Sequence, residues 1–167
     1  MITRYSSIRN KTLAKSFFKD ALHEASSYDR IAGYFSSSII ELAGEDIDTV
    51  AGQVRIVCNS HLQIDDVKFI KMHPKAIKDE WCEEQNPDEL AKIPERLKRL
   101  YRFLKSGKIS VKVIPDEIFG LIHGKAGVIT QGNGEKVAFL GSMNETQSGW
   151  TRNYELVWVD DDLEGIR

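Results

Sequence analysis

The fold is decided by residues 121–144, LIHGKAGVITQGNGEKVAFLGSMN, in which two apolar runs flank a short polar segment. Both runs, Leu121 to Thr130 and Lys136 to Gly141, are rich in the residue types that favour strands. The segment between them, Gln131-Gly132-Asn133-Gly134, has the composition of a tight turn. The sequence therefore predicts a β-hairpin here, and the rest of the sheet is expected to assemble around it.

Apolar periodicity elsewhere predicts strands and helices that alternate before this hairpin. Further strands are expected at Arg30–Phe35, Gln53–Asn59, Lys108–Ile114 and Tyr154–Val159. Helices are expected at Thr12–Ser27, after Ser36-Ser37-Ser38, and at Asp65–Lys78 and Asp88–Lys105. This order predicts an α/β domain, a mixed β-sheet flanked by helices on both faces, with residues 1–167 forming one domain.

Composition limits the class of protein. The chain has 167 residues, of which 41% are hydrophobic and 29% charged, as expected for a single globular domain. A net charge of -2 gives no overall attraction to nucleic acid, although a local basic cleft remains compatible with it. No apolar run approaches the roughly 20 residues of a membrane helix. Two cysteines are too few for a disulfide framework, so a cytoplasmic location is expected.

Five polar side chains gather on the hairpin and on the strand that follows it. His123 and Lys125 lie two residues apart, and the period of a strand places both on one face. Ser142 and Asn144 repeat this spacing at the end of the second strand. Glu155 lies among apolar residues of the last strand, where a carboxylate needs a partner, and a histidine is an obvious candidate.

In this order, His-x-Lys, Gly-Ser-x-Asn and a downstream Glu resemble the active-site motif of the phospholipase D superfamily, over residues 122–159. The spacing is most similar to that of small bacterial nucleases and metal-independent restriction endonucleases. Residues 17–37 resemble phospholipase D-like domains at the N-terminus of bacterial helicases, which implies that the natural chain continues into a helicase. The family's usual Asp is replaced here by Thr130, and the resemblance implies that nuclease-type members can lack it.

The resemblance implies a phosphodiesterase that needs no metal or other cofactor. One histidine would attack phosphorus while a second protonates the leaving oxygen. Because the full motif, His-x-Lys followed closely by Gly-Ser-x-Asn, occurs once in the chain, two copies of His123 would meet across the axis of a homodimer. Lys125 and Asn144 would bind the non-bridging oxygens, with Ser142 adding a hydrogen bond. Glu155 would accept the Nδ1 proton of His123 and so fix its tautomer.

The function implied is an endonuclease acting on DNA or RNA, with DNA favoured, in bacterial defence against foreign DNA. Two alternatives stay open. One is phospholipid hydrolysis or phosphatidyl transfer, and the other is a non-catalytic module for dimerisation or nucleic-acid binding. Basic residues between Arg96 and Lys105 could contact DNA or could form the solvated side of a helix.

A zinc site is the remaining alternative among the polar residues. Cys58, His61, His73 and Cys82 supply four potential ligands, but their spacing matches no compact zinc-binding pattern. The sequence therefore favours a site without metal.

Overall fold

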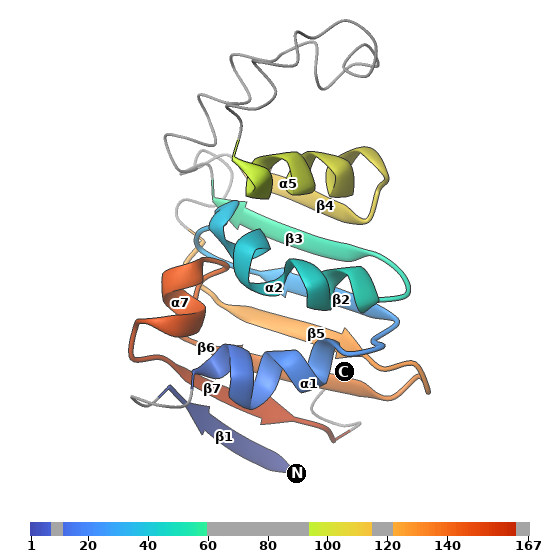
Figure 1. Ribbon diagram of the computed structural model, residues 1–167. Helices are drawn as coiled ribbons and strands as arrows, with labels where there is room; N and C mark the ends of the chain where they lie inside the picture. The colour runs from blue at the N-terminus through green and yellow to red at the C-terminus, as the bar shows by residue number, and fades with distance from the viewer. Residues whose placement is uncertain (8–11, 60–93, 115–121, 163–167) are drawn as a thin grey trace, which may run out of the picture.

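Seven strands form one sheet in the computed structural model, which describes residues 1–7, 12–59, 94–114 and 122–162. In chain order the strands are β1 (Ile2–Ser6), β2 (Ser27–Ile31), β3 (Val54–Asn59), β4 (Ile109–Ile114), β5 (Ala126–Thr130), β6 (Lys136–Gly141) and β7 (Leu156–Asp160). The helical segments are η1 (Ala14–Phe18), a π-helical turn continued by α1 (Lys19–Leu22), then α2 (Ser38–Thr49), α5 (Glu95–Lys105) and α7 (Gln147–Thr151). Figure 1 shows this arrangement.

Pairing changes from parallel to antiparallel in the middle of the sheet. The strand order is β1-β7-β6-β5-β2-β3-β4, with β2, β3 and β4 parallel and the remaining pairs antiparallel. Parallel neighbours need crossover connections, and α2 and α5 lie in the two that join β2, β3 and β4. As a result, the C-terminal ends of β2, β3 and β6 and the N-terminal end of β5 meet at one end of the sheet. Ligand sites of open α/β sheets form at such switch points.

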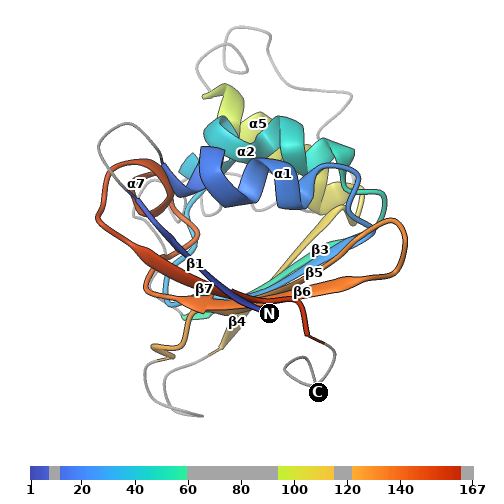
Figure 2. The ribbon, with the colours of Figure 1, turned by 90° about the horizontal axis from the view of Figure 1, so that it is seen from below.

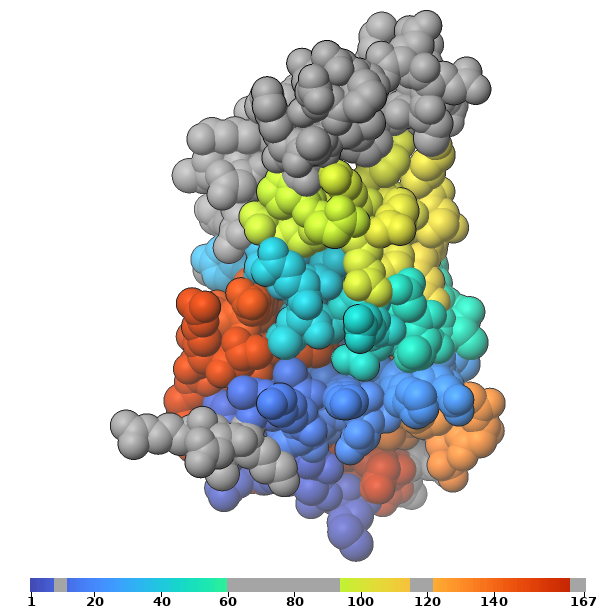
Figure 3. All heavy atoms as spheres, viewed as in Figure 1, coloured from blue at the N-terminus to red at the C-terminus, as the bar shows by residue number. Residues whose placement is uncertain are grey.

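The core lies between the sheet and a layer formed by α1, α2 and α5, which cover the same face in Figures 2 and 3. Residues spaced four apart on α2, Ile39, Ala43 and Ile47, are buried against the sheet. Aromatic rings fill the space under α1, where Phe18 stacks on Trp150 with a centroid distance of 4.1 Å. Trp150 is thus a core residue.

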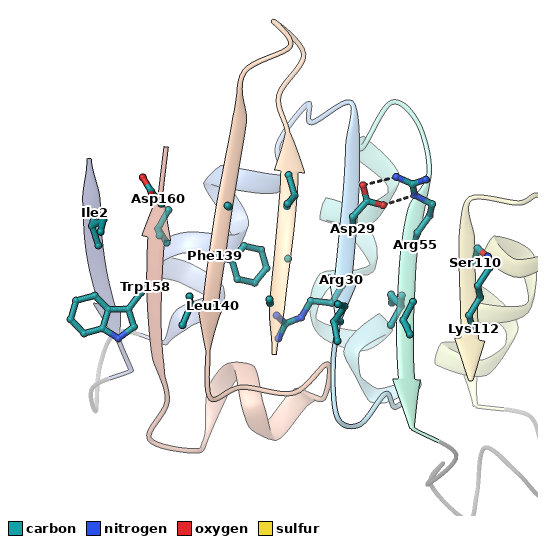
Figure 4. Close-up of a pocket in the computed structure, with 18 residues that line it drawn as sticks. Ile2, Asp29, Arg30, Arg55, Ser110, Lys112, Phe139, Leu140, Trp158 and Asp160 are labelled. Carbon is teal, nitrogen blue, oxygen red and sulfur yellow. Dashed lines mark hydrogen bonds and ion pairs between the residues drawn. The ribbon is translucent and has the colours of Figure 1, made fainter. Parts of the chain in front are cut away.

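The opposite face of the sheet carries no helix within the described ranges (Figure 2). A shallow cavity of about 670 Å³ spreads over this face and is lined by side chains from all seven strands (Figure 4). Ile31, Leu140 and Trp158 are between 45% and 61% exposed there. The mixed sheet with helices is confirmed, whereas the second helical layer does not appear among the described residues. The helix expected at Asp65–Lys78 lies outside them.

Several elements begin or end at other residues than predicted. The first helix ends at Leu22 rather than Ser27, because residues 27–31 join the sheet as β2. The strand expected at Arg30–Phe35 is therefore displaced toward the N-terminus. The helix expected at Asp88–Lys105 is described from Glu95 onward, and β1 was not predicted.

The hairpin itself is confirmed, but its first strand is shorter than predicted. Gln131 N–H donates to Glu135 O at 2.7 Å, and Gly134 has a φ of 87°, which favours glycine. β5 begins only at Ala126, so His123 and Lys125 lie in the loop before it. The alternation of side chains along a strand therefore does not determine where these two side chains point. Their positions depend instead on hydrogen bonds of the loop, such as that from Lys125 Nζ to His123 O.

Candidate active site

The loop before β5 presents His123 to solvent and holds Lys125 partly buried. Lys125 Nζ donates to the backbone oxygen of His123 at 2.7 Å, which folds the lysine back along its own loop. The backbone oxygen of Lys125 accepts from Gly141 N–H at 2.9 Å. The loop is thereby joined to the end of β6.

The turn after β6 brings Ser142 beside Glu155, which directly precedes β7 rather than lying within the last strand as predicted. Ser142 Oγ donates to Glu155 Oε2, and Leu156 N–H donates to Ser142 Oγ at 3.1 Å. The other carboxylate oxygen of Glu155 accepts from Asn153 Nδ2 at 3.2 Å. Within the described ranges, these two side chains rather than a histidine are the hydrogen-bond partners of this buried carboxylate. The expected pairing of Glu155 with His123 stays a prediction.

Gly33, in the loop after β2, is where the two halves of the site converge. A Cβ atom at Gly33 would lie 3.0 Å from Asn144 Oδ1 and 3.4 Å from Lys125 Nζ. Asn144 Oδ1 also accepts from Tyr34 N–H at 3.1 Å. Because its oxygen is held by the backbone, Asn144 can offer its Nδ2 hydrogens to a bound anion. Lys125 and Asn144 therefore form a small cationic and polar cluster over Gly33.

A buried ion pair supports this cluster from the core. Arg30 Nε donates to Glu145 Oε1 at 2.6 Å, and Tyr28 OH donates to the same oxygen at 2.9 Å. Arg30 Nη2 donates to the backbone oxygen of Met143 at 2.6 Å. Arg30 thus binds the backbone of Met143, which lies between Ser142 and Asn144. Its ion-pair partner, Glu145, directly follows Asn144.

The charges around Lys125 alter its acidity. Partial burial, and to a lesser degree the positive charge of Arg30, hold the pKa of Lys125 below its ordinary value, while Glu155 opposes this shift. The three charged groups therefore interact electrostatically although they come from β2, the loop before β5 and the residue before β7. Tyr28 has its pKa raised well above the ordinary value by burial and by Glu145, so its hydroxyl remains a donor.

Thr130, at the position of the family's usual Asp, lies at the far end of β5 from the site. Its backbone oxygen accepts from Ser26 N–H at 2.7 Å. Thr130 is five positions along the chain from Lys125, which in a strand corresponds to roughly 16 Å. A carboxylate at this position would therefore not reach the cluster over Gly33.

The other candidate residues lie away from this cluster. Cys58 is buried in the core, where burial raises the pKa of its thiol to about 11. The remaining potential zinc ligands, His61, His73 and Cys82, lie outside the described residues. Arg96 and Arg99 of α5 pair with Glu41 and Asp48 of α2.

Three residues that shape the site had no predicted role: Arg30, Glu145, and Asn59, whose side-chain amide binds the backbone of Ile122. Gly33 lies within the expected strand Arg30–Phe35, and nothing in that sequence indicates that Asn144 and Lys125 approach its backbone more closely than a larger residue would allow. A sequence signal existed for Arg30, because a charged residue in the expected strand Arg30–Phe35, which is otherwise mostly apolar, needs a partner.

None of the helices in the described ranges combines the length and apolarity needed to cross a membrane.

Residues 18–166 match the family described as cardiolipin synthase, PLD-like domain, where PLD is phospholipase D. None of the curated protein sequences matches the chain.

Solved structures resemble the fold over nearly the whole chain. NucT from Helicobacter pylori is 16% identical, with a TM-score of 0.55 over 99% of this chain and 89% of that one. Nuc from Salmonella typhimurium, a phospholipase D family member, is 15% identical, with a TM-score of 0.54 over 99% and 86%.

A third solved structure is a histidine mutant of yeast tyrosyl-DNA phosphodiesterase, 13% identical with a TM-score of 0.58 over 96% of this chain. The chain spans 32% of that enzyme. Because the family match covers most of the sequence and includes all five expected site residues, the chain belongs to the phospholipase D-like domain family.

Proposed function

We propose that this protein is a phosphodiesterase that cleaves DNA through a phosphohistidine formed on His123, without a metal ion. The observation that carries the proposal is the convergence of Lys125 Nζ and Asn144 over Gly33, next to the loop that exposes His123. A cation and an amide held at one point suit the non-bridging oxygens of a phosphodiester.

The reaction would proceed in two displacements at phosphorus. In the first, a ring nitrogen of His123 forms a bond to phosphorus as the bond to the leaving oxygen breaks, and a second histidine gives that oxygen a proton. In the second, water attacks phosphorus, the same second histidine takes its proton, and the phosphorus–nitrogen bond breaks. Lys125 and Asn144 would stabilise the charge on the non-bridging oxygens in both steps.

The second histidine would come from another copy of the chain. The full motif, His-x-Lys followed closely by Gly-Ser-x-Asn, occurs once in the sequence, whereas His73-Pro74-Lys75 repeats only its first part. His123 is exposed, so that a second copy can approach it. A homodimer with a two-fold axis would place the two His123 rings on either side of one phosphodiester. We propose that the active unit is this dimer, and that a helicase domain follows in the natural chain.

DNA is proposed as the substrate because one related fold belongs to an enzyme named for a tyrosyl-DNA phosphodiester. α5 is not favoured as the DNA-binding surface, because two of its arginines form ion pairs with carboxylates of α2. Contacts to DNA would then centre on the loops at the end of the sheet, where Lys125 lies. A location in the cytoplasm and a role in defence remain predictions.

The test is cleavage of plasmid DNA, oligonucleotides and a generic phosphodiester in the presence of EDTA. The wild-type protein is compared with His123→Ala and with His23→Ala, which removes an exposed histidine near the end of α1. We expect cleavage by wild type and His23→Ala and none by His123→Ala. Quenching with a denaturant at alkaline pH, which preserves the acid-labile phosphorus–nitrogen bond, should leave label from a radiolabelled substrate on the protein only when His123 is present.

Other outcomes identify the alternative functions. DNA binding without cleavage of any substrate would indicate a non-catalytic module, and selective hydrolysis of phospholipid vesicles would indicate a lipid enzyme. Sedimentation measures the oligomeric state directly. A monomer that cleaves DNA with full activity would contradict the shared site.

A further inference from the structure

Asn59, at the C-terminal end of β3, forms two hydrogen bonds with the backbone of the residue that precedes His123. Its Nδ2 donates to the backbone oxygen of Ile122 at 2.7 Å, and Ile122 N–H donates to Asn59 Oδ1 at 2.7 Å. Asn59 is 1% exposed, and the two residues are 63 positions apart in the sequence. A single side-chain amide thus satisfies both backbone groups of Ile122, as a neighbouring strand would do.

The loop that carries His123 needs such an anchor because it lies outside the strand ladder. β5 begins at Ala126, and the backbone contact closest to the histidine on its C-terminal side is the bond from Gly141 N–H to Lys125 O. His123 itself is exposed. On its N-terminal side, the bonds to Asn59 are therefore what locate the backbone beside it within the described residues.

The same residue is joined to the other half of the site. Asn59 N–H donates to the backbone oxygen of Gly33 at 3.4 Å, and Gly33 lies against Asn144 and Lys125. A Cβ at Gly33 would also lie 3.4 Å from the backbone oxygen of Ile122. Asn59 therefore links the histidine loop to the loop that supports Asn144.

We propose that Asn59 is a positioning residue that sets the distance of His123 from the groups over Gly33. The inference rests on the proposed function for its effect on rate, but its structural part stands without it. Displacement of a nucleophile by about 1 Å can lower a rate by roughly 100-fold. Loss of the two bonds should therefore reduce turnover more than substrate binding.

The variants Asn59→Ala and Asn59→Asp test this. The first removes both bonds, while the second retains an acceptor for Ile122 N–H and loses the donor to Ile122 O. The matched control is Gln131→Ala, because Gln131 Nε2 also donates to a distant backbone oxygen, that of Ala21 at 2.9 Å. Gln131 directly follows β5, at the end remote from His123.

We expect kcat to fall roughly 10- to 100-fold in both Asn59 variants with KM changed by less than about threefold. Gln131→Ala should retain kcat within about twofold, whatever its melting temperature. If the Asn59 variants lose no more kcat than Gln131→Ala at a similar melting temperature, Asn59 does not position His123.

Amide hydrogen exchange separates this inference from the proposed function. Ile122 N–H should be protected in wild type and in Gln131→Ala, and should exchange at least tenfold faster in Asn59→Ala. Unchanged exchange at Ile122 would overturn the inference even if the protein is active. Protection that depends on Asn59 in a protein without His123-dependent cleavage would support the anchor and contradict the phosphodiesterase.

Discussion

Arg30 and Glu145 form an ion pair of 2.6 Å between side chains that are 0% and 2% exposed, directly beneath the turn that holds Ser142 and Asn144. The pair joins β2 to residues 115 positions later in the chain. Arg30 also donates to Met143 O, so that one guanidinium binds both the carboxylate and the backbone of the turn. The core of this protein is therefore polar where it supports the candidate site.

Breaking this ion pair should lower both the stability of the protein and its cleavage activity, and a second substitution should restore the stability alone. Glu145→Leu leaves the charge of Arg30 buried without its carboxylate and should lower the free energy of unfolding by about 3–5 kcal/mol. Adding Arg30→Met removes that charge and should restore much of the stability, as measured by urea denaturation. Cleavage by the double variant should remain low, because Met143 O has lost its donor. Wild-type activity in the double variant would show that the pair does not hold the turn.

Crowding at Gly33 should affect activity with little effect on folding. In Gly33→Ala, the new methyl group would meet Asn144 Oδ1 at 3.0 Å and Lys125 Nζ at 3.4 Å. We expect the rate of cleavage to fall about 10- to 100-fold, and the free energy of unfolding to change by less than about 1 kcal/mol. Gly124→Ala is the control, because a Cβ there meets no atom within 4 Å. Equal losses of activity in both variants would contradict the crowding argument.

As the pH is raised, the rate of cleavage should begin to decline at a lower pH than expected for a lysine with an ordinary pKa. The ammonium of Lys125 is present below its pKa, and partial burial together with Arg30 lowers that pKa. The stabilising cation is therefore lost as the pH rises through this lowered pKa. A pH–rate profile should show the alkaline limb move upward in Lys125→Arg, whose guanidinium stays charged. Lys112→Arg, at an exposed position on β4, should leave the limb in place.

Local signals were sufficient to predict the hairpin and most of the sheet. The alternating strand pattern of β4 and the turn at residues 131–134 both appear where expected. The pattern overextended β5, because Ile122, His123 and Lys125 continue the alternation of a strand although β2 ends at Ile31 and offers no further partner. β1 escaped prediction because its side chains are mostly exposed and so show little apolar periodicity.

The five expected site residues were predicted from their order in the chain, but the residues that support them in the structure were not. Asn59 and Ile122 are 63 residues apart, and Arg30 and Glu145 are 115 apart. Such contacts depend on strand order, in particular on β2 lying between β5 and β3. Spacing within a single sequence contains no record of that order, so buried polar partners of this kind become visible only in three dimensions.

The pairing of β1 with β7 has a consequence for how the protein acquires its site. Ser7 Oγ accepts from Glu155 N–H at 2.7 Å across an interval of 148 residues, and Ile2 pairs with Asp160. Contacts so distant in sequence form slowly, since a long loop must close first. During synthesis, β1 cannot join the sheet until β7, the strand with which it pairs, has left the ribosome. A nascent chain therefore carries His123 and Lys125 well before the backbone of Glu155 is secured by Ser7.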